Sequence, residues 1–399
     1  MPRNVLFVEN ALGFGGSTVA MGRVLSRLDP AKFRPFVVVS QEAHRDWLTR
    51  CKMTDAEIEV VAMPVARITG EGGVAKAALA TLDHARRTAP YVRKILEFAR
   101  ARDVELFHLN NSVLVNLGGI LAARWLGVPC VIKQHGYEWH SREVRWAARS
   151  VRHYMPCSED VARDVERLGV ARDRMTTTYC PIDVARHDVE ARGVRDELGL
   201  PADAPAFGIA GCLQEWKGQH VFLDAAAKVL ARRPEARAVL LGAPPAQECA
   251  PYEKRLREMA AASGFGDRIV FVGHRDDTPR ILAAVDVWVH ASIVPEPFGM
   301  VVGEAMASRK PVIAARAGGP MEIVEEGVTG LLTKPGDAEG LADALLRLLG
   351  DADLRRAMGE AGRRRVENLF GLDRHMEMTE RVYERALIGS PSEITTTQP

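Results

Sequence analysis

The sequence carries no excess charge of either sign and no long apolar run. Lys and Arg total 53 against 52 Asp and Glu, so the composition does not indicate a nucleic-acid-binding protein. No apolar run approaches the ~20 residues that a membrane-spanning helix needs. The first residues, MPRNVLFVEN, lead directly into an expected strand and lack the apolar core and cleavage site of a signal peptide. These absences predict a cytoplasmic protein, at most resting on a membrane surface.

Motifs for disulfides, metals and nucleotide cofactors are also missing. The six cysteines form no C-x-x-C pair, which favours reduced thiols. His135 and His140 have no Cys or carboxylate set around them, so we expect no metal site. The run Gly13-x-Gly15-Gly16 does not complete a dinucleotide fingerprint, because Thr18 stands at the third glycine position. The sequence also has no Walker loop and no Gly-x-Ser-x-Gly elbow. We therefore expect no bound cofactor.

Short runs rich in β-branched residues alternate with longer helical patterns along the 399 residues. This alternation is typical of βαβ units, and the length exceeds that of one hydrophobic core. The pattern restarts near Ala206 after a polar stretch, so the sequence predicts an α/β protein of two doubly wound domains, followed by a helix and a disordered tail. The predicted ranges are 1–183 for the first domain, 184–205 for the linker, 206–371 for the second domain, 372–389 for the helix and 390–399 for the tail.

The expected elements can be stated as ranges. Strands are predicted at 5–8, 36–39, 106–109, 130–133, 153–156, 206–210, 238–241, 269–272, 285–290, 311–314 and 330–332. Helices are predicted at 17–28, 75–101, 217–231, 251–262, 340–349 and 372–387.

The stretch PEPFGMVVGEA places two carboxylates, Glu296 and Glu304, around the expected start of a helix near Gly299. Ligands of open α/β sheets bind at the carboxyl ends of the strands, and a helix N-terminus there offers free N–H groups to an anion. The arrangement fits a ligand with a diphosphate in the middle and a sugar at each end. Two isolated glutamates would more often be solvated surface acids. The surrounding sequence is therefore needed to favour a ligand-binding role.

That context is a resemblance. The segment EPFGMVVGEAMASRKPVIAARAGGPMEIVEEGVTGLL, residues 296–332, resembles the donor-site signature of the family-four glycosyltransferases, retaining enzymes of the GT-B fold. The family's acid, seven residues, acid pattern falls on Glu296 and Glu304, and its Gly-Gly turn falls on Gly318 and Gly319.

Three further segments carry the resemblance. GCLQEWKG, residues 211–218, matches a signature that follows the first strand of the family's C-terminal domain. ALGFGGST, residues 11–18, resembles the family's glycine loop. KQHGYEW places His135 where the family carries a histidine facing the donor sugar. The resemblance implies a GT-B fold, with two Rossmann-like domains facing a cleft and a C-terminal helix that returns to the N-terminal domain.

The resemblance also implies residue roles. Glu304 would hold the ribose hydroxyls, Glu296 would contact the transferred sugar, and Lys217 would neutralise the departing diphosphate. The implied catalytic residues are His135, Lys217 and Glu296. The implied donor-binding residues are Gly15, Gly16, Cys212, Lys217, His274, Arg275, Glu296, Phe298, Gly299, Met300, Val301 and Glu304.

One position departs from the family pattern, because Cys212 replaces the family's phosphate arginine. Losing that cation would cost on the order of 2–4 kcal/mol of transition-state stabilisation, by analogy with a lost oxyanion donor. Arg275, Arg316 and Arg142 could substitute. The alternatives are that Lys217 and the helix N-terminus suffice, or that the protein is a poorly active or inactive homologue.

The implied reaction transfers a hexose-type sugar, with retention and without a metal, from a nucleoside-diphosphate sugar. UDP is favoured and GDP is next. A front-face reaction is the favoured mechanism, because no acid near His135 could act as a covalent nucleophile. A nucleotide-sugar epimerase or phosphorylase shares the architecture. A non-catalytic sugar- or nucleotide-binding protein is an alternative of another class.

The acceptor is the least determined partner, and a glycan, a lipid-linked or a small-molecule acceptor would fit cell-surface polysaccharide or glycolipid synthesis. Basic residues are frequent in 76–102, and those in 139–153 lie beside Trp139 and Trp146. They suggest peripheral contact with an anionic membrane, although ordinary solvated helix faces explain them equally well.

Overall fold

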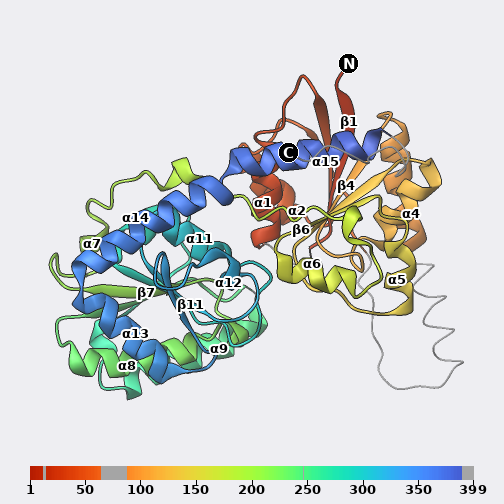
Figure 1. Ribbon diagram of the computed structural model, residues 1–399. Helices are drawn as coiled ribbons and strands as arrows, with labels where there is room; N and C mark the ends of the chain where they lie inside the picture. Colours follow the sequence, from red (N-terminus) through yellow and green to blue (C-terminus); the bar gives the residue numbers. More distant parts are fainter. Residues whose placement is uncertain (12–14, 64–87, 246, 389–399) are drawn as a thin grey trace, which may run out of the picture. The chain divides into compact units, whose positions relative to one another are not determined.

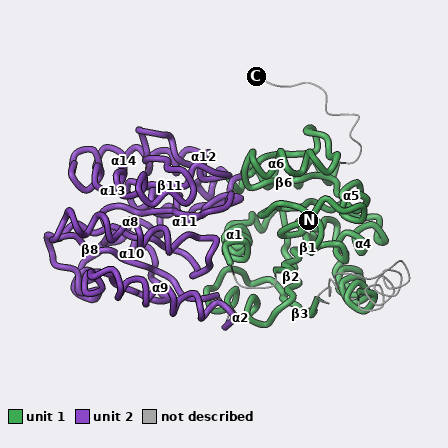
Figure 2. The backbone as a smooth tube through the Cα atoms, turned by 90° about the horizontal axis from the view of Figure 1, so that it is seen from below, with its two compact units in different colours: residues 1–178, 375–399 green, residues 179–374 purple. Residues whose placement is uncertain are grey.

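The computed structural model describes residues 1–11, 15–63, 88–245 and 247–388. Its chain forms two compact units, shown in green and purple in Figure 2. Unit 1 comprises Met1–Thr178 and His375–Pro399, and unit 2 comprises Tyr179–Arg374. No helix in the described ranges combines the length and the apolar character needed to cross a bilayer.

Unit 1 is built on a parallel sheet of six strands in the order β3-β2-β1-β4-β5-β6. The strands are β1 (Arg3–Glu9), β2 (Phe33–Val39), β3 (Glu57–Val60), β4 (Leu106–Asn110), β5 (Cys130–Gln134) and β6 (His153–Pro156). The central strands are buried on both faces, which explains their near-continuous apolar sequence.

Helices connect the parallel strands of unit 1, as parallel pairing requires (Figure 1). They are α1 (Gly16–Leu25), α2 (Glu42–Arg50), α4 (Leu117–Leu126), α5 (Arg142–Ala148) and α6 (Glu159–Glu166), with a further helical segment at 88–100 and a 3₁₀ turn η1 (Arg172–Arg174). The last helix, α15 (Leu372–Leu387), belongs to unit 1 from His375 onward. Its Tyr383 is buried and bonds to His108 of β4 at 2.6 Å.

Unit 2 repeats the plan with a parallel sheet in the order β12-β11-β10-β7-β8-β9. The strands are β7 (Ala206–Ala210), β8 (Arg237–Leu241), β9 (Ile269–Gly273), β10 (Val287–His290), β11 (Val312–Ala315) and β12 (Gly330–Thr333). Two Rossmann-like units with parallel sheets are the GT-B architecture, so the predicted fold class is confirmed.

The helices of unit 2 enclose a core that includes Phe207, Phe222 and Leu345. They are α7 (Val194–Glu197), α8 (Gln219–Arg232), α9 (Ala250–Ala262), α10 (Thr278–Ala284), α11 (Met300–Ala307), α12 (Pro320–Ile323), α13 (Ala338–Gly350) and α14 (Ala352–Leu369). Helix α8 packs on α13, and α11 packs on α14.

The structure differs from the expected elements at β3, which the sequence did not predict. Its sequence, EIEV, alternates charged and apolar residues at the edge of the sheet, and only four residues pair. The first part of the helix expected at 75–101 and the tail at 390–399 lie outside the described residues. The stretch expected to link the domains contains no strand in its described course, only the 3₁₀ turn η2 (Val184–His187) and α7.

The strand orders locate one switch point in each sheet. In unit 1 the order reverses between β1 and β4, and in unit 2 between β7 and β10. Connections from the two central strands leave in opposite directions at such a point, so their carboxyl ends open a crevice where ligands bind.

Candidate active site

The loop that follows β7 brings Lys217 to the switch point of unit 2. Gly218 has a φ of +71° and lies so close to the loop after β10 that an added Cβ would stand 2.0 Å from the carbonyl oxygen of Ala291. The N–H of Ile293 donates to the carbonyl of Trp216 at 2.9 Å. The two loops are therefore joined by backbone contacts, and glycine at position 218 permits their approach.

Glu296 is the centre of a buried polar cluster at this point. The Lys217 ammonium donates to Oε1 of Glu296 at 2.7 Å. Nε2 of His290 lies 2.6 Å from Oε2, and the Ser292 hydroxyl donates to the same oxygen at 3.0 Å. Glu296 is only 9% exposed. Both carboxylate oxygens are thus fixed by partners from the ends of two adjacent strands.

The surroundings keep Glu296 ionised. Burial by itself favours the neutral acid, but the charge and hydrogen bond of His290, followed by those of Lys217, hold the pKa of the Glu296 carboxyl well below its usual value. Lys217 also lies 4.2 Å from the centroid of the Trp216 ring. The cluster therefore presents a fixed cation beside a fixed anion.

Helix α11 begins immediately after this cluster. Its N-cap is Gly299, with a φ of +91°, and no side chain caps the helix N-terminus. The Gly318–Gly319 turn packs against the same backbone, because Gly319 donates its N–H to the carbonyl of Glu296 at 2.8 Å. A Cβ on Gly319 would stand 2.4 Å from the carbonyl oxygen of Pro297. The N–H groups of this first turn are the diphosphate ligands that the sequence motif predicts.

The predicted donor-binding residues in and just before α11 differ in exposure. Phe298 is 3% exposed, and its ring packs against Tyr179 and Phe370, so its backbone and not its side chain can meet a ligand. Met300 and Val301 are half-buried in the first turn. Glu304 lies one turn further along and is also half-buried.

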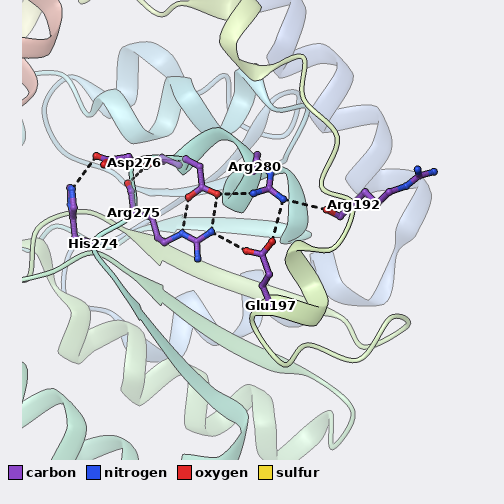
Figure 3. Close-up of polar contacts among 8 residues, drawn as sticks. Arg192, Glu197, His274, Arg275, Asp276 and Arg280 are labelled. Carbon is purple, nitrogen blue, oxygen red and sulfur yellow. Dashed lines mark hydrogen bonds and ion pairs between the residues drawn. The ribbon is translucent and has the colours of Figure 1, made fainter. Parts of the chain in front are cut away.

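Of the arginines suggested as substitutes at Cys212, two in unit 2 are held by carboxylates. Cys212 itself is an exposed, free cysteine. Arg275 donates to Asp277 at 2.7 and 2.8 Å and to Glu197 at 3.0 Å, in the network that Figure 3 shows. Arg316 donates to Glu326 at 2.6 Å.

His274, a predicted donor-binding residue, and Arg142, the third suggested arginine, are both exposed. His274 is largely exposed, and its Nε2 lies 3.4 Å from a carboxylate oxygen of Asp276. Arg142 is the exposed first residue of α5 in unit 1. Lys217 is therefore the cation that the structure brings to Glu296.

Unit 1 places its own polar cluster at the switch point between β1 and β4. Glu9 ends β1 and is fully buried; it accepts hydrogen bonds from the Asn110 and Asn111 amides and, at 2.8 Å, from the Ala11 N–H. Asn110 in turn lies 3.0 Å from Nε2 of His135, which follows β5. The predicted His135 is thus positioned from Glu9 through Asn110.

The predicted glycines of unit 1 lie beside this cluster. Gly15 precedes α1 as its N-cap in an extended conformation, and Gly16 is the first residue of the helix. Asn110 donates to the carbonyl of Ser17 at 3.2 Å, which ties the first turn of α1 to the end of β4. A Cβ on Gly15 would meet no atom within 4 Å, so space is open on that side.

No sequence motif predicted Glu9, Asn110, His290 or Ser292 as site residues. Each lies at or just after the carboxyl end of a buried strand, where a polar residue interrupts an apolar run. That signal was present in the sequence, because His290 ends the predicted strand 285–290. Among the described residues, no group of three or more His, Cys, Asp or Glu side chains could hold a metal ion.

Comparison with known families matches both halves of the chain. The model described as "Glycosyl transferases group 1" matches residues 192–365. The model described as "Glycosyltransferase Family 4" matches residues 59–186. The two matches together support a glycosyltransferase of the family-4 type. The predicted family is therefore confirmed.

Individual relatives support the same assignment over part of their length. The chain is 36% identical over 178 residues to the lipopolysaccharide core biosynthesis glycosyltransferase LpsE of Rhizobium meliloti, covering 44% of this chain and 48% of that protein. It is 35% identical over 206 residues to the D-inositol 3-phosphate glycosyltransferase of Nocardia farcinica, covering 51% and 46%. The matched region thus spans about half the length of these curated relatives.

Solved structures extend the likeness of fold over nearly the whole chain. The structure of Anabaena HepE in complex with UDP-glucose is similar with a TM-score of 0.80 and 24% identity, covering 96% of this chain and 99% of that one. At this identity the similarity establishes the fold.

Proposed function

We propose that this protein is a retaining, metal-independent glycosyltransferase that moves a hexose-type sugar from a nucleoside-diphosphate sugar to an acceptor hydroxyl. The observation that carries the proposal is the cluster of Lys217, His290 and Ser292 around Glu296, directly before the uncapped N-terminus of α11. The cluster combines a cation and free N–H groups for a diphosphate with an ionised carboxylate for sugar hydroxyls.

The roles follow from where charge develops. As the bond between the anomeric carbon and the diphosphate oxygen breaks, negative charge grows on the leaving diphosphate, where Lys217 and the α11 N–H groups stabilise it. Positive charge grows on the sugar, where the Glu296 carboxylate acts. The leaving phosphate oxygen takes the proton of the attacking acceptor hydroxyl, which bonds to the same face of the sugar. Glu304 holds the ribose.

The donor is a UDP-sugar, with a GDP-sugar as the next candidate. The fold-level likeness to HepE, whose structure contains UDP-glucose, supports this choice. The acceptor is a glycan, a lipid-linked saccharide or a small molecule in cell-surface polysaccharide or glycolipid synthesis. The similarity to a lipopolysaccharide core glycosyltransferase supports this class of acceptor. Peripheral contact with an anionic membrane stays a prediction.

A thermal-stability panel of UDP, GDP, ADP, their sugars and NAD tests the proposal. A ligand present at about 100 times its Kd stabilises the fold by ~2.7 kcal/mol, which such a panel resolves. We expect UDP and UDP-sugars to stabilise most, and Lys217→Gln to reduce their effect. Stabilisation by NAD alone, or by none of the nucleotides, would overturn the proposal.

A further inference from the structure

Unit 1 contains a basic cavity that no part of the proposed reaction uses. It has a volume of about 890 Å³ and opens where β5 and β6 begin. Its lining includes the segment before β5, the segment before β6 and the end of α15. The charged residues in its lining are Arg124, Arg149, Arg152, Arg174, Arg385 and Asp173.

The cavity lies at the opposite end of the strands from the candidate active site. Val128 and Pro129 line it immediately before β5, whereas His135 follows the carboxyl end of that strand. A strand of five residues spans about 16 Å. The cavity is therefore a separate site within unit 1, and not an extension of the His135 cluster.

Three helices end at this cavity, which offers a simple explanation for part of its charge. Arg124 lies in the last turn of α4, Arg149 is the C-cap of α5, and Arg385 lies in the last turn of α15. Cations stabilise helix C-termini, each of which carries roughly half a negative charge. Three such ends offset about one and a half charges, whereas five arginines and Asp173 sum to a net charge of about four. A positive surplus remains.

Neighbouring protein groups do not neutralise this excess positive charge. Arg174 donates to the backbone carbonyls of Arg149 and Val151 and so caps the end of α5. Across the described parts of the chain, the other four arginine side chains form no ion pair or hydrogen bond with another side chain. Each is exposed or half-buried, so their guanidinium groups are accessible to a ligand.

The positive charges of the cavity also affect a buried histidine beside it. His153 is 8% exposed and shares a hydrogen bond of 2.8 Å with the hydroxyl of Thr176. Burial first, and then the charges of Arg385 and Arg174 against the opposing Asp173, lower the pKa of His153 to about 4. The neighbourhood therefore disfavours a further cation and favours an anion.

We propose that this cavity binds a multiply phosphorylated anion through the guanidinium groups of Arg124, Arg149, Arg152 and Arg385. Guanidinium groups bind phosphate oxygens with two parallel hydrogen bonds each, and arginine remains charged at every physiological pH. A cavity of 890 Å³ is within the range of small-molecule sites and holds more than one phosphate group. The phosphates could belong to a soluble molecule or to a lipid headgroup.

Calorimetric titration of the full-length protein with orthophosphate, pyrophosphate and tripolyphosphate tests the proposal. We expect affinity to rise with the number of phosphates, because a longer anion engages several guanidinium groups at once. The double variant Arg149→Gln/Arg385→Gln should weaken tripolyphosphate binding by about tenfold or more. The loss of a single charge-assisted contact already has an effect of about this size. Added salt should weaken binding to the wild type.

Two controls distinguish this site from general electrostatics and from the donor site. Lys94→Gln/Arg142→Gln removes two exposed positive charges of unit 1 outside the cavity, and it should leave tripolyphosphate binding unchanged. Lys217→Gln removes the cation of the proposed donor site, and tripolyphosphate should still bind in the cavity. If the donor site proves to be wrong, the phosphate cavity can still be correct. If the cavity proves to be wrong, the donor site can still be correct.

Flotation with phosphatidylcholine vesicles, with and without phosphatidate, separates the two sources of phosphate. Vesicle binding that requires phosphatidate and is lost in Arg149→Gln/Arg385→Gln would assign the site to a lipid headgroup. Binding of soluble tripolyphosphate with the same dependence would assign it to a soluble ligand. Equal binding of both ligands by the wild type and the cavity variant, or binding of neither, would overturn the proposal.

Discussion

At the scale of single residues, the two glutamates of the sequence motif have different surroundings. Glu296 is buried and bonded to Lys217, His290 and Ser292, whereas Glu304 is half-buried on α11. A carboxylate held by two basic groups can act on a developing positive charge. A carboxylate further along the helix suits a part of the donor that does not react.

Replacing each glutamate by Gln separates these roles. Glu296→Gln should lower kcat on the order of 10²-fold, because it removes charge that acts in the transition state, and it should leave the binding of bare UDP nearly unchanged. Glu304→Gln should weaken binding of bare UDP by about tenfold, with a smaller effect on kcat. Calorimetry of each variant with UDP measures the affinity, and turnover assays of the same variants measure kcat. If both variants bind UDP like the wild type, Glu304 is not a ribose ligand.

The lowered pKa of Glu296 has a consequence for stability in acid. Its folded-state pKa lies below the value of about 4.3 in the unfolded chain, so the unfolded chain takes up the proton more readily. The stabilisation by ionised Glu296 is therefore complete above about pH 5 and is lost as the pH falls below about 4.3. In urea unfolding, the difference in unfolding free energy between wild type and Glu296→Gln should become smaller in acid. A difference that stays constant down to about pH 3.5 would contradict this.

At the scale of elements, the site depends on loops that only glycine can close. Gly218→Ala places a Cβ at 2.0 Å from the Ala291 carbonyl oxygen, in a residue with a φ of +71°. Gly264→Ala is the matched control, with a φ of +78° and nothing within 4 Å. The control should cost about 1–2 kcal/mol of unfolding free energy for backbone strain alone. Gly218→Ala should cost about 1–3 kcal/mol more and should also weaken UDP binding through the displaced Lys217. Equal losses in the two variants would argue against a close contact between the loops.

Helix α15 is held to the sheet of unit 1 by a buried hydrogen bond between Tyr383 and His108. Burial, together with His135 and Lys133, lowers the pKa of His108 to about 3, so the ring is neutral and shares this bond with the Tyr383 hydroxyl. Tyr383→Phe leaves that nitrogen unsatisfied and should cost about 1–3 kcal/mol in urea unfolding. Glu380→Gln, on the same helix, removes an ion pair with the exposed Lys32 and should therefore cost less than Tyr383→Phe. A larger loss for Glu380→Gln would reverse this account.

The elements also show what the sequence could reveal. Buried parallel strands have continuous apolar sequences, so β1 and β10 are evident from their residues. The edge strand β3 is not evident from its residues, because its short alternating sequence becomes a strand only by pairing with β2. The motif resemblance predicted Glu296 and Lys217 as site residues. Their direct ion pair was not predictable, because it depends on the spatial order of β7 and β10.

At the scale of the whole molecule, each unit places a buried glutamate at the switch point of its sheet. In unit 1 this is Glu9 at the end of β1, held by asparagine amides. In unit 2 it is Glu296 after β10, held by Lys217 and His290. Neutral partners leave Glu9 a positioning group for His135, whereas Lys217 gives unit 2 the charge that a diphosphate requires. This asymmetry agrees with a donor bound mainly by unit 2.

The stereochemical course tests the reaction as a whole. In the proposed front-face reaction the acceptor oxygen bonds to the face that the diphosphate leaves, and the leaving phosphate accepts the acceptor's proton. NMR of the glycoside formed from an α-linked UDP-sugar should therefore show an α-linked product. Turnover should also persist in EDTA, because Lys217 and the α11 N–H groups supply the stabilisation of the diphosphate. A β-linked first product would eliminate the front-face reaction. Activity lost in EDTA and restored by a divalent cation would show that a metal, and not Lys217 alone, stabilises the leaving group.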